Sequence, residues 1–274
     1  MNSYKGKTAL ITGASSGIGL AMAHELSKRG AIVVMAARSR DKLDIEAQVI
    51  RKNGNQAHTF TTDLSLPNSA EKLYRNVISA GLNIDLLVNN AGYGRWGDFT
   101  EFDCEDYGLM IQLNITSLTD LCHLAIPDMI SKGGGGIINV GSTASFVPVP
   151  YSAVYGASKA YVLMFSESIR YEYADQHINV MALCPGATKS NFSTVATANS
   201  SVELQKLNAK IADDTQSGET SKEVAVEGLD VFLQNKSFVL TGKSNKKMGI
   251  VPRFLTRKKM LKIVGDGFRK RVLK

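Results

Sequence analysis

Cysteine, histidine clusters and long apolar runs are scarce in this chain of 274 residues. The three cysteines, Cys104, Cys122 and Cys184, form no CxxC pair and join no group of histidines, which argues against a disulfide framework and a zinc site. We therefore expect no bound metal. No stretch approaches the roughly 18 consecutive apolar residues of a membrane helix, so we expect neither a membrane span nor a secretion signal. These absences favour a reducing, cytoplasmic setting.

Basic residues are concentrated at one end of the chain. Residues 243–274 contain twelve Lys and Arg and one acid, a net charge of +11, whereas residues 1–242 carry −4. A mildly acidic main body argues against a nucleic-acid partner. With 44% hydrophobic residues, the chain can bury one sizeable core. We therefore interpret residues 1–242 as a single domain and residues 243–274 as a basic C-terminal extension.

Short apolar runs alternate with longer stretches of helical character. The runs occupy residues 8–12, 31–37, 84–90, 136–142 and 178–184, and the helical candidates occupy residues 17–29, 40–53, 68–80, 104–131 and 153–175. This alternation predicts an α/β fold with a parallel sheet. In such a sheet, ligands bind at the carboxyl ends of the strands. Residues 189–220, rich in Ser, Thr, Asn and Ala, fit either a substrate loop or an ordinary surface excursion.

A glycine-rich turn, ITGASSGIG at residues 11–19, follows the first apolar run and opens a helix. Gly13, Gly17 and Gly19 permit a tight turn and let the backbone approach a pyrophosphate closely. The unpaired amides at the start of the helix favour an anion. The spacing TGxxxGxG differs from the GxGxxG of many dinucleotide sites, but its place between strand and helix predicts a dinucleotide phosphate site.

The end of the second apolar run indicates which dinucleotide is bound. An acid at this point usually holds the adenosine ribose hydroxyls, whereas a ribose phosphate needs a cation. Here the run ends in Ala36 and Ala37, and Arg38 follows with a planar guanidinium suited to a phosphate. The sequence therefore predicts NADP(H), with Ser39 as a further hydroxyl donor. Arg40 could share or replace the role of Arg38, and a merely solvated Arg38 is the alternative.

Tyr155 and Lys159 stand four residues apart in a predicted helix and share one face of it. A nearby ammonium favours phenolate and so lowers the pKa of a tyrosine, which lets the pair supply or take a proton. The spacing YxxxK is common by chance, and simple packing is the alternative. Ser142, at the end of the fourth apolar run, and Asn114, a polar residue in an apolar helical segment, favour the chemical interpretation.

Together these motifs resemble the short-chain dehydrogenase/reductase family. The resemblance rests on TGxxxGxG at residues 12–19, NNAG at 89–92, Asn114, Ser142, Tyr155 with Lys159, and PG at 185–186, in order and spacing over about residues 5–242. It implies a Rossmann fold of three α/β/α layers in one catalytic domain, and a hydride-transfer enzyme. The segment VGS at residues 140–142 departs from the family, which often has two serines there, but the second serine is kept.

The resemblance also implies a role for each matching residue. Tyr155 protonates the carbonyl oxygen during reduction, and Ser142 polarises that oxygen. Lys159 holds the nicotinamide ribose and lowers the pKa of the tyrosine, while Asn114 holds a water that relays protons. The positions that match the coenzyme contacts of the family are Gly13, Ser15, Ser16, Gly17, Ile18, Gly19, Arg38, Ser39, Asp63, Leu64, Asn90, Ala91, Gly92, Tyr155, Lys159, Pro185, Gly186, Thr188 and Ser190. By analogy with the family we expect a homo-oligomer, a dimer or a tetramer.

The groups expected to face the nicotinamide are largely apolar and aromatic, although several of them could instead be core. They are Trp96, Phe99, Phe146, Val149, Tyr151 and Phe192. A pocket of this kind suits a hydrophobic carbonyl compound or its alcohol better than a charged sugar phosphate. We therefore predict an NADP(H)-dependent oxidoreductase that interconverts a ketone or aldehyde and an alcohol. The alternative from another class is a catalytically idle NADP(H)-binding sensor or scaffold that acts through its basic tail.

The tail mixes apolar residues with many cations. Such a segment can dock on its own body or on a neighbouring subunit, which we favour, lie on an anionic membrane surface, or be disordered. Gly265 and Gly267 are expected to weaken a continuous helix there.

Overall fold

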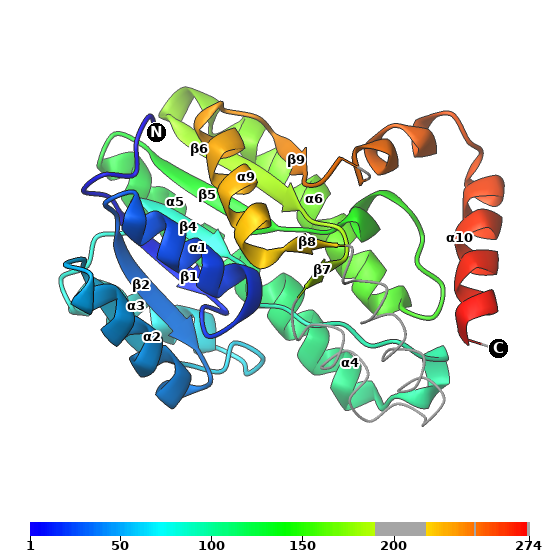
Figure 1. The fold of residues 1–274 in the computed structure, drawn as a ribbon, viewed down its shortest axis with the longest axis horizontal. Helices are drawn as coiled ribbons and strands as arrows, with labels where there is room; N and C mark the ends of the chain where they lie inside the picture. The colour runs from blue at the N-terminus through cyan, green and yellow to red at the C-terminus, as the bar shows by residue number, and fades with distance from the viewer. Residues whose placement is uncertain (190–217, 244, 273–274) are drawn as a thin grey trace.

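The protein is built on one sheet of seven parallel strands. The computed structural model describes residues 1–189, 218–243 and 245–272 (Figure 1). The strands of this sheet are β1 (Thr8–Thr12), β2 (Ile32–Ala37), β3 (Ala57–Thr61), β4 (Leu86–Asn89), β5 (Gly135–Val140), β6 (Ile178–Cys184) and β9 (Phe238–Leu240). Their order is β3-β2-β1-β4-β5-β6-β9. The prediction of a doubly wound parallel sheet is confirmed.

Two layers of helices cover the sheet. One face carries α1 (Gly17–Lys28), α2 (Arg40–Lys52) and α9 (Ser221–Leu233), and the other carries α3 (Ser69–Ser79), α5 (Ser117–Ser131) and α6 (Ala153–Glu172). Met22 and Leu26 of α1 and Phe232 of α9 share the first core, while Leu73 and Leu121 belong to the second. Each such side chain stabilises the fold by about 1.5–3 kcal/mol when it is fully buried. The three-layer arrangement is thus held by two separate apolar cores.

The strand order reverses between β1 and β4, which are neighbours in the middle of the sheet. From β1 the chain proceeds outward through β2 and β3, then returns to β4 on the other side of β1 and proceeds through β5 and β6. A crevice forms at the carboxyl ends of the strands at such a reversal. The glycine-rich turn follows β1, and the NNAG segment includes the end of β4. Both therefore lie at the edge of the sheet where a ligand is expected.

Several elements of the described residues were not among the predicted strands and helices. They include β3, β9, α9 and the last helix, α10 (Arg257–Val272). β3 has the mixed sequence AHTFT at the sheet edge, and β9 has only three residues, so neither produces a clear apolar run. Residues 188–189 (β7) and 219–220 (β8) pair in parallel, which joins the two ends of the expected substrate loop.

Residues 104–131 form an almost continuous helical segment that contains a π-helical turn. α4 (Cys104–Ile111) leads into the π turn (Gln112–Thr116) and then into α5. This segment is the single stretch of the described residues that is long and apolar enough to cross a membrane by length and composition. In the structure it packs against the sheet and α3, and 44% of its most apolar window is buried. Several of its buried side chains, such as Leu121 and Ala125, belong to the second core.

The basic extension folds into two short helical turns and α10. The first turn (Asn245–Gly249) packs near the end of β9, and Asn245 donates a hydrogen bond to the Thr241 carbonyl over 2.9 Å. α10 continues through Gly265 and Gly267, contrary to the expectation that these glycines weaken a helix there. Gly265 lies close to Pro150, where a Cβ would be only 3.5 Å from the proline ring. Figure 1 shows α10 in red at the periphery of the molecule.

Candidate active site

Ser142 and Tyr155 meet at the carboxyl edge of the sheet. Ser142 follows β5 and caps a short 3₁₀ turn, where its Oγ accepts a hydrogen bond of 3.1 Å from the Ala144 amide. Tyr155 lies in the first turn of α6 and is buried. Burial raises the pKa of Tyr155 to about 12, while a hydrogen bond with Ser142 acts in the opposite direction. The phenol therefore holds its proton at neutral pH.

Lys159 lies one helical turn beyond Tyr155, as the sequence predicts. Its Nζ is 5.8 Å from the centre of the Tyr155 ring and donates a hydrogen bond of 2.8 Å to the Val140 carbonyl. Burial lowers the pKa of Lys159 to about 8. The resemblance implies a tyrosine whose pKa is lowered by the lysine; in this structure burial raises the pKa of Tyr155, and the opposing influence is the hydrogen bond with Ser142. The lysine, rather than the phenol, titrates close to neutral pH.

Asn114 lies in the π turn between α4 and α5 and is buried. Its amide donates to the Tyr93 carbonyl over 2.9 Å and to Ser158 Oγ over 3.1 Å, and its Oδ1 accepts a bond of 3.1 Å from the Tyr93 amide. Ser158 in turn donates to the Tyr155 carbonyl over 2.8 Å. The π turn is an irregularity that is frequent at functional sites. Here it places a polar side chain between the segment after NNAG and the catalytic helix.

Two glycines let the segment after β4 approach this cluster. A Cβ on Gly92 would lie 3.0 Å from Asn114 Oδ1 and 3.5 Å from Lys159 Nζ. A Cβ on Gly94 would lie 3.1 Å from two atoms of the Tyr155 ring. Gly92 was predicted as a coenzyme residue, whereas Gly94 was not singled out in the sequence, because its role depends on a contact with a residue 61 positions away. The two glycines bring Asn114, Tyr155 and Lys159 against one backbone segment.

The glycine-rich turn packs against Asn90. Gly13 and Gly17 have φ values of 65° and 57°, which favour glycine, and a Cβ on Gly13 would lie 2.7 Å from Asn90 Nδ2. Asn90 Nδ2 donates to the Thr12 carbonyl over 2.9 Å. Thr12 Oγ1 accepts the amides of Asn90 and Ala91 at 3.0 Å each. Thr12, whose role was missed in the sequence, thus joins the two predicted coenzyme segments.

The backbone amides at the N-terminus of α1 are not capped by the Ser16 side chain and can bind an anion. Ser16 is the exposed N-cap residue of α1, and its side chain makes no capping hydrogen bond. Ser15, Gly17, Ile18 and Gly19 complete the turn, and a Cβ on Gly19 would collide with the Gly13 carbonyl and with Asn90. A backbone cradle that side chains would fill, next to a helix N-terminus, fits a pyrophosphate.

Arg38 and Asp63 lie at the adenosine end of the predicted site. Arg38 follows β2, and its guanidinium is 3.9 Å from the Asp63 carboxylate, with 71% of the arginine side chain exposed. Asp63 accepts hydrogen bonds from the amide and the hydroxyl of Ser65 at 3.0 and 2.6 Å. Ser39 is the N-cap residue of α2, and Leu64 is buried beside Asp63. The strand end thus has a cation and no acid of its own.

The predicted nicotinamide segment follows β6. Pro185 is buried, and Thr188 donates a hydrogen bond of 3.0 Å to the Gly186 carbonyl. The side chain of Asn245 fills the place where a Cβ on Gly186 would be, a contact between the body and the extension that was not predicted. Ser190 and Phe192 lie outside the described residues.

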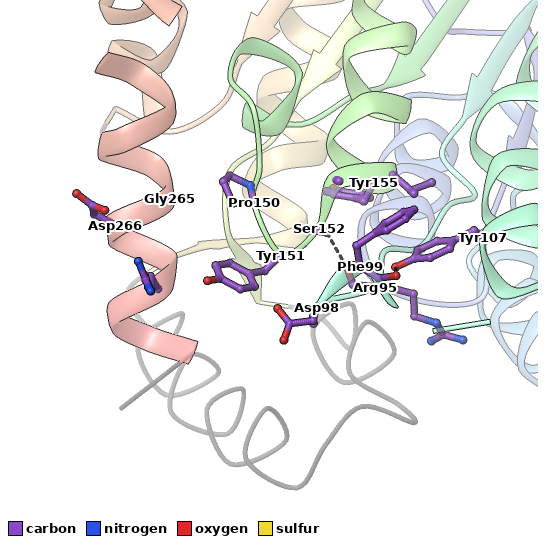
Figure 2. Close-up of a pocket in the computed structure, with 14 residues that line it drawn as sticks. Arg95, Asp98, Phe99, Tyr107, Pro150, Tyr151, Ser152, Tyr155, Gly265 and Asp266 are labelled. Atoms are coloured by element: carbon purple, nitrogen blue, oxygen red, sulfur yellow. Dashed lines mark hydrogen bonds between the residues drawn. The ribbon is translucent and has the colours of Figure 1, made fainter. Parts of the chain in front are cut away.

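A pocket of about 340 Å³ opens beside Tyr155 (Figure 2). Phe99 and Tyr151, two of the predicted substrate residues, line it. Its other lining residues are Arg95, Gly97, Asp98, Tyr107, Pro150, Ser152, Ala153, Val154, Gly265, Asp266 and Arg269. The C-terminal helix therefore forms one wall of this pocket, and Figure 2 shows it facing Pro150 and Tyr151.

Three of the predicted substrate residues do not line this pocket. The Trp96 ring packs against Phe268 of α10 at 5.0 Å between ring centres. Phe146 packs against Phe238 at 5.6 Å, and Val149 is buried against Gly156. The rings of Trp96 and Phe146 thus pack against other rings of the protein instead of lining this pocket, and Trp96 attaches the extension to the body. Within the described ranges, no group of three or more His, Cys, Asp or Glu is arranged to hold a metal ion.

The fold and this site define a nicotinamide-dependent oxidoreductase that acts on carbonyl and alcohol groups. The family model for short chain dehydrogenases matches residues 7–201, and the chain belongs to that family. The resemblance found in the motifs is thereby confirmed.

Relatives of known sequence and structure agree with this assignment. The chain is 33% identical over 211 residues to an uncharacterized oxidoreductase of Thermotoga maritima, covering 76% of this chain and 83% of the relative. It is 30% identical over 257 residues to the very-long-chain 3-oxoacyl-CoA reductase of Mus musculus, covering 91% and 77%. A short-chain dehydrogenase from Sphingobium yanoikuyae, solved in complex with NADPH, superposes with a TM-score of 0.77 at 28% identity, covering 97% and 95%.

Proposed function

We propose that this protein is an NADP(H)-dependent oxidoreductase that interconverts a hydrophobic ketone or aldehyde and its alcohol, with Tyr155 as the general acid and base. The observation that carries the proposal is the position of Tyr155. Its buried ring lies at the wall of a pocket of about 340 Å³, hydrogen-bonded with Ser142 and one helical turn from Lys159. A protonated phenol in this place is the proton donor that carbonyl reduction requires.

In the reductive direction, the substrate oxygen accepts hydrogen bonds from the hydroxyls of Tyr155 and Ser142. The Tyr155 hydroxyl transfers its proton to that oxygen as the carbon is reduced, and Ser142 stabilises the charge that develops on the oxygen. The bound coenzyme supplies the hydride. In the oxidative direction, the phenolate of Tyr155 takes the proton of the alcohol. Because burial disfavours the phenolate, the site favours the state in which Tyr155 holds a proton.

Lys159 and Asn114 return the proton to Tyr155. Burial lowers the pKa of Lys159 from 10.5 to about 8, so its ammonium gives up a proton to a hydrogen-bonded neighbour more readily than that of an exposed lysine. Asn114 contacts the Tyr93 backbone and Ser158, within the same buried cluster. We assign to Asn114 the task of holding a water between this cluster and Lys159. Lys159 would also hold the nicotinamide ribose when the coenzyme is bound.

The coenzyme residues of this chain fit a nicotinamide dinucleotide, and several features favour NADP(H). The second strand ends in Ala36 and Ala37, so it offers no carboxylate to the adenosine ribose. Arg38 is largely exposed and lies beside Asp63, where its guanidinium can turn toward a ribose phosphate. The relative from Sphingobium yanoikuyae was solved with NADPH.

Part of the pocket wall supports the proposed substrate class. Phe99, Pro150, Tyr151 and Val154 supply apolar surface to the pocket, which suits a hydrophobic carbonyl compound, and its other walls include the charged residues Arg95, Asp98, Asp266 and Arg269. The mouse relative is a very-long-chain 3-oxoacyl-CoA reductase, whose substrate name likewise combines a ketone with a long apolar chain. We extend the proposal to a homo-oligomer, since Met164 and Tyr171 of α6 are 71% and 88% exposed and available to a second subunit. The scarcity of cysteine supports placing it in the cytoplasm.

A coenzyme-oxidation screen tests the proposal. Purified protein is incubated with NADPH and a panel of aromatic and aliphatic ketones and aldehydes, while absorbance of the reduced coenzyme and the alcohol product are both followed. We expect turnover with the more apolar members and formation of the corresponding alcohol. NADPH binding without turnover across the whole panel would favour the rival function, an idle coenzyme-binding sensor or scaffold.

A further inference from the structure

The beginning of the C-terminal extension exposes an unusual amount of apolar surface. Among the described residues, twelve large hydrophobic side chains are exposed, and five of them fall within residues 250–263. They are Ile250 (59%), Val251 (42%), Phe254 (83%), Leu261 (48%) and Ile263 (59%). Scattered exposed apolar side chains are ordinary, but Ile250, Val251 and Phe254 fall within five residues ahead of α10, and such a local group marks an interaction surface. Leu261 and Ile263, two residues apart on α10, face in different directions.

The same segment exposes many cations. The exposed basic side chains are Lys243, Lys246, Lys247, Arg257, Lys258, Lys259, Lys262 and Arg269. Lys246 pairs with Glu227 at 3.3 Å and Lys262 pairs with Asp266 at 2.9 Å. Asp266 is the only acid between residues 243 and 274. The segment therefore presents apolar groups in a strongly positive field, which selects an anionic partner.

The attachment of α10 to the body leaves this surface available. Met260, Val264 and Phe268 recur at intervals of four residues and lie on the face of α10 that is buried or half-buried. Phe268 contacts the Trp96 ring, and Met260 is 6% exposed. Lys258 and Lys262 lie on the opposite face by helical spacing and are exposed, whereas Arg269 lines the pocket. α10 is thus held by one face while these two lysines stay exposed.

We propose that residues 245–263 form a docking surface for an anionic lipid bilayer. Phe254 and Ile250 would enter the interfacial region, and the surrounding lysines and arginines would contact lipid headgroup phosphates and carboxylates. A nucleic acid would engage the cations and leave the apolar side chains in water. A second copy of the segment would bring like charges together. An anionic bilayer satisfies both the apolar and the basic groups.

This placement has a consequence for the active site. Gly265, Asp266 and Arg269 of α10 line the pocket beside Tyr155. Docking through residues 245–263 would therefore hold the pocket close to the lipid surface, from which an apolar substrate could enter. That consequence rests on the proposed function, whereas the binding of the bilayer does not.

Vesicle flotation with the full chain tests the inference without any enzyme assay. The probes are vesicles of phosphatidylserine and phosphatidylcholine in equal parts, and vesicles of phosphatidylcholine alone. We expect the protein to float with the anionic vesicles only, and to be released as salt is raised. Each basic residue near an anionic surface contributes about a fivefold gain in partitioning. Lys258→Gln with Lys259→Gln should therefore lower partitioning by about twentyfold, and Phe254→Glu by at least about tenfold.

Matched control variants separate the surface from general effects of charge and folding. Lys42→Gln with Lys52→Gln removes the same charge from exposed positions on α2, and Ile45→Glu changes a side chain that is 59% exposed, as Ile263 is. These controls should partition like the unmodified protein, and thermal unfolding checks that every variant is folded. Absence of flotation, equal binding to both vesicles, or equal losses in the controls would overturn the inference. So would a dimer dissociated by Phe254→Glu without vesicle binding, or duplex DNA binding that Phe254→Glu leaves unchanged while vesicles are not bound.

Discussion

The Nζ of Lys159 lies 5.8 Å from the centre of the Tyr155 ring, one turn further along α6. Both side chains are buried, and burial has opposite effects on them: it raises the pKa of Tyr155 to about 12 and lowers that of Lys159 to about 8. A phenol that keeps its proton therefore stands beside an ammonium that releases its proton close to neutral pH. The pair combines a proton donor with a lysine that is more acidic than an exposed one.

The buried ammonium makes a pH-dependent contribution to stability. The pKa of Lys159 is about 8 in the folded protein, against 10.5 for an ordinary lysine. Between these two pH values the unfolded chain binds more protons, so the folded state gains stability as pH rises. Relative to Lys159→Met, the unmodified protein should gain up to about 3 kcal/mol of unfolding free energy across this window. Urea unfolding of both proteins at a series of pH values measures the difference. A flat difference, or one with the opposite slope, would contradict the buried charge.

Gly94 gives Tyr155 its space. A Cβ at this position would lie 3.1 Å from the ring, so Gly94→Ala should displace the phenol and lower kcat by about tenfold while coenzyme affinity changes little. Gly108→Ala is the matched control, because no atom lies within 4 Å of the Cβ it would add. Steady-state kinetics and coenzyme titration of both variants provide the comparison. An unchanged kcat in Gly94→Ala would show that the ring is not constrained by this contact.

The coenzyme preference tests Arg38. Arg38→Asp replaces a guanidinium suited to a ribose phosphate with a carboxylate suited to ribose hydroxyls, so the ratio of kcat/KM for NADPH over NADH should fall by at least about tenfold. Arg40→Asp makes the same change two residues further on, where the side chain is 79% exposed and 3.6 Å from Asp44. A larger shift in Arg40→Asp than in Arg38→Asp would transfer the role to Arg40.

Removing the contact between Trp96 and Phe268 tests whether α10 contributes to substrate binding in the pocket. Phe268→Ala removes this ring contact of 5.0 Å, and an aromatic pair of this kind contributes about 0.5–1.5 kcal/mol beyond its buried area. We expect KM for a bulky ketone to rise by about fivefold, with little change in kcat, because the loss corresponds to about 1 kcal/mol of binding. Phe254→Ala is the control, since Phe254 belongs to the same extension but is 83% exposed. Equal effects of the two variants would remove α10 from the pocket.

The parts of the fold that were predictable have strong local patterns. The buried strands β1, β2, β4, β5 and β6 are continuous apolar runs, and the glycine-rich turn needs specific residues for its backbone, so both are visible in the sequence. The strands β3 and β9 are short or mixed, and α10 depends on tertiary contacts. A Cβ on Gly265 would make an ordinary contact of 3.5 Å with Pro150, so nothing in the structure explains why this helix has a glycine there.

The site likewise has parts that local sequence patterns predict and parts that they do not. Motif spacing identified Ser142, Tyr155 and Lys159, and the structure brings them together. Trp96 was expected in the pocket, but aromatic character alone does not distinguish a pocket wall from a packing contact, and Trp96 packs on Phe268. The π turn at Asn114 and the contact between Asn245 and Gly186 depend on residues that are far apart in the sequence. No pattern in the local sequence reports contacts of this kind.

Single-turnover kinetics of Tyr155→Phe show whether the Tyr155 hydroxyl donates the proton to the substrate. With the best ketone of the screen, oxidation of enzyme-bound NADPH in a single turnover should slow by a factor of about 10² to 10⁴, while the affinity for NADPH stays within a few-fold of the unmodified protein. Tyr151→Phe makes the same chemical change at another residue of the same pocket and should keep most of its rate. A Tyr155→Phe variant that reduces the ketone as fast as the unmodified protein would contradict the account.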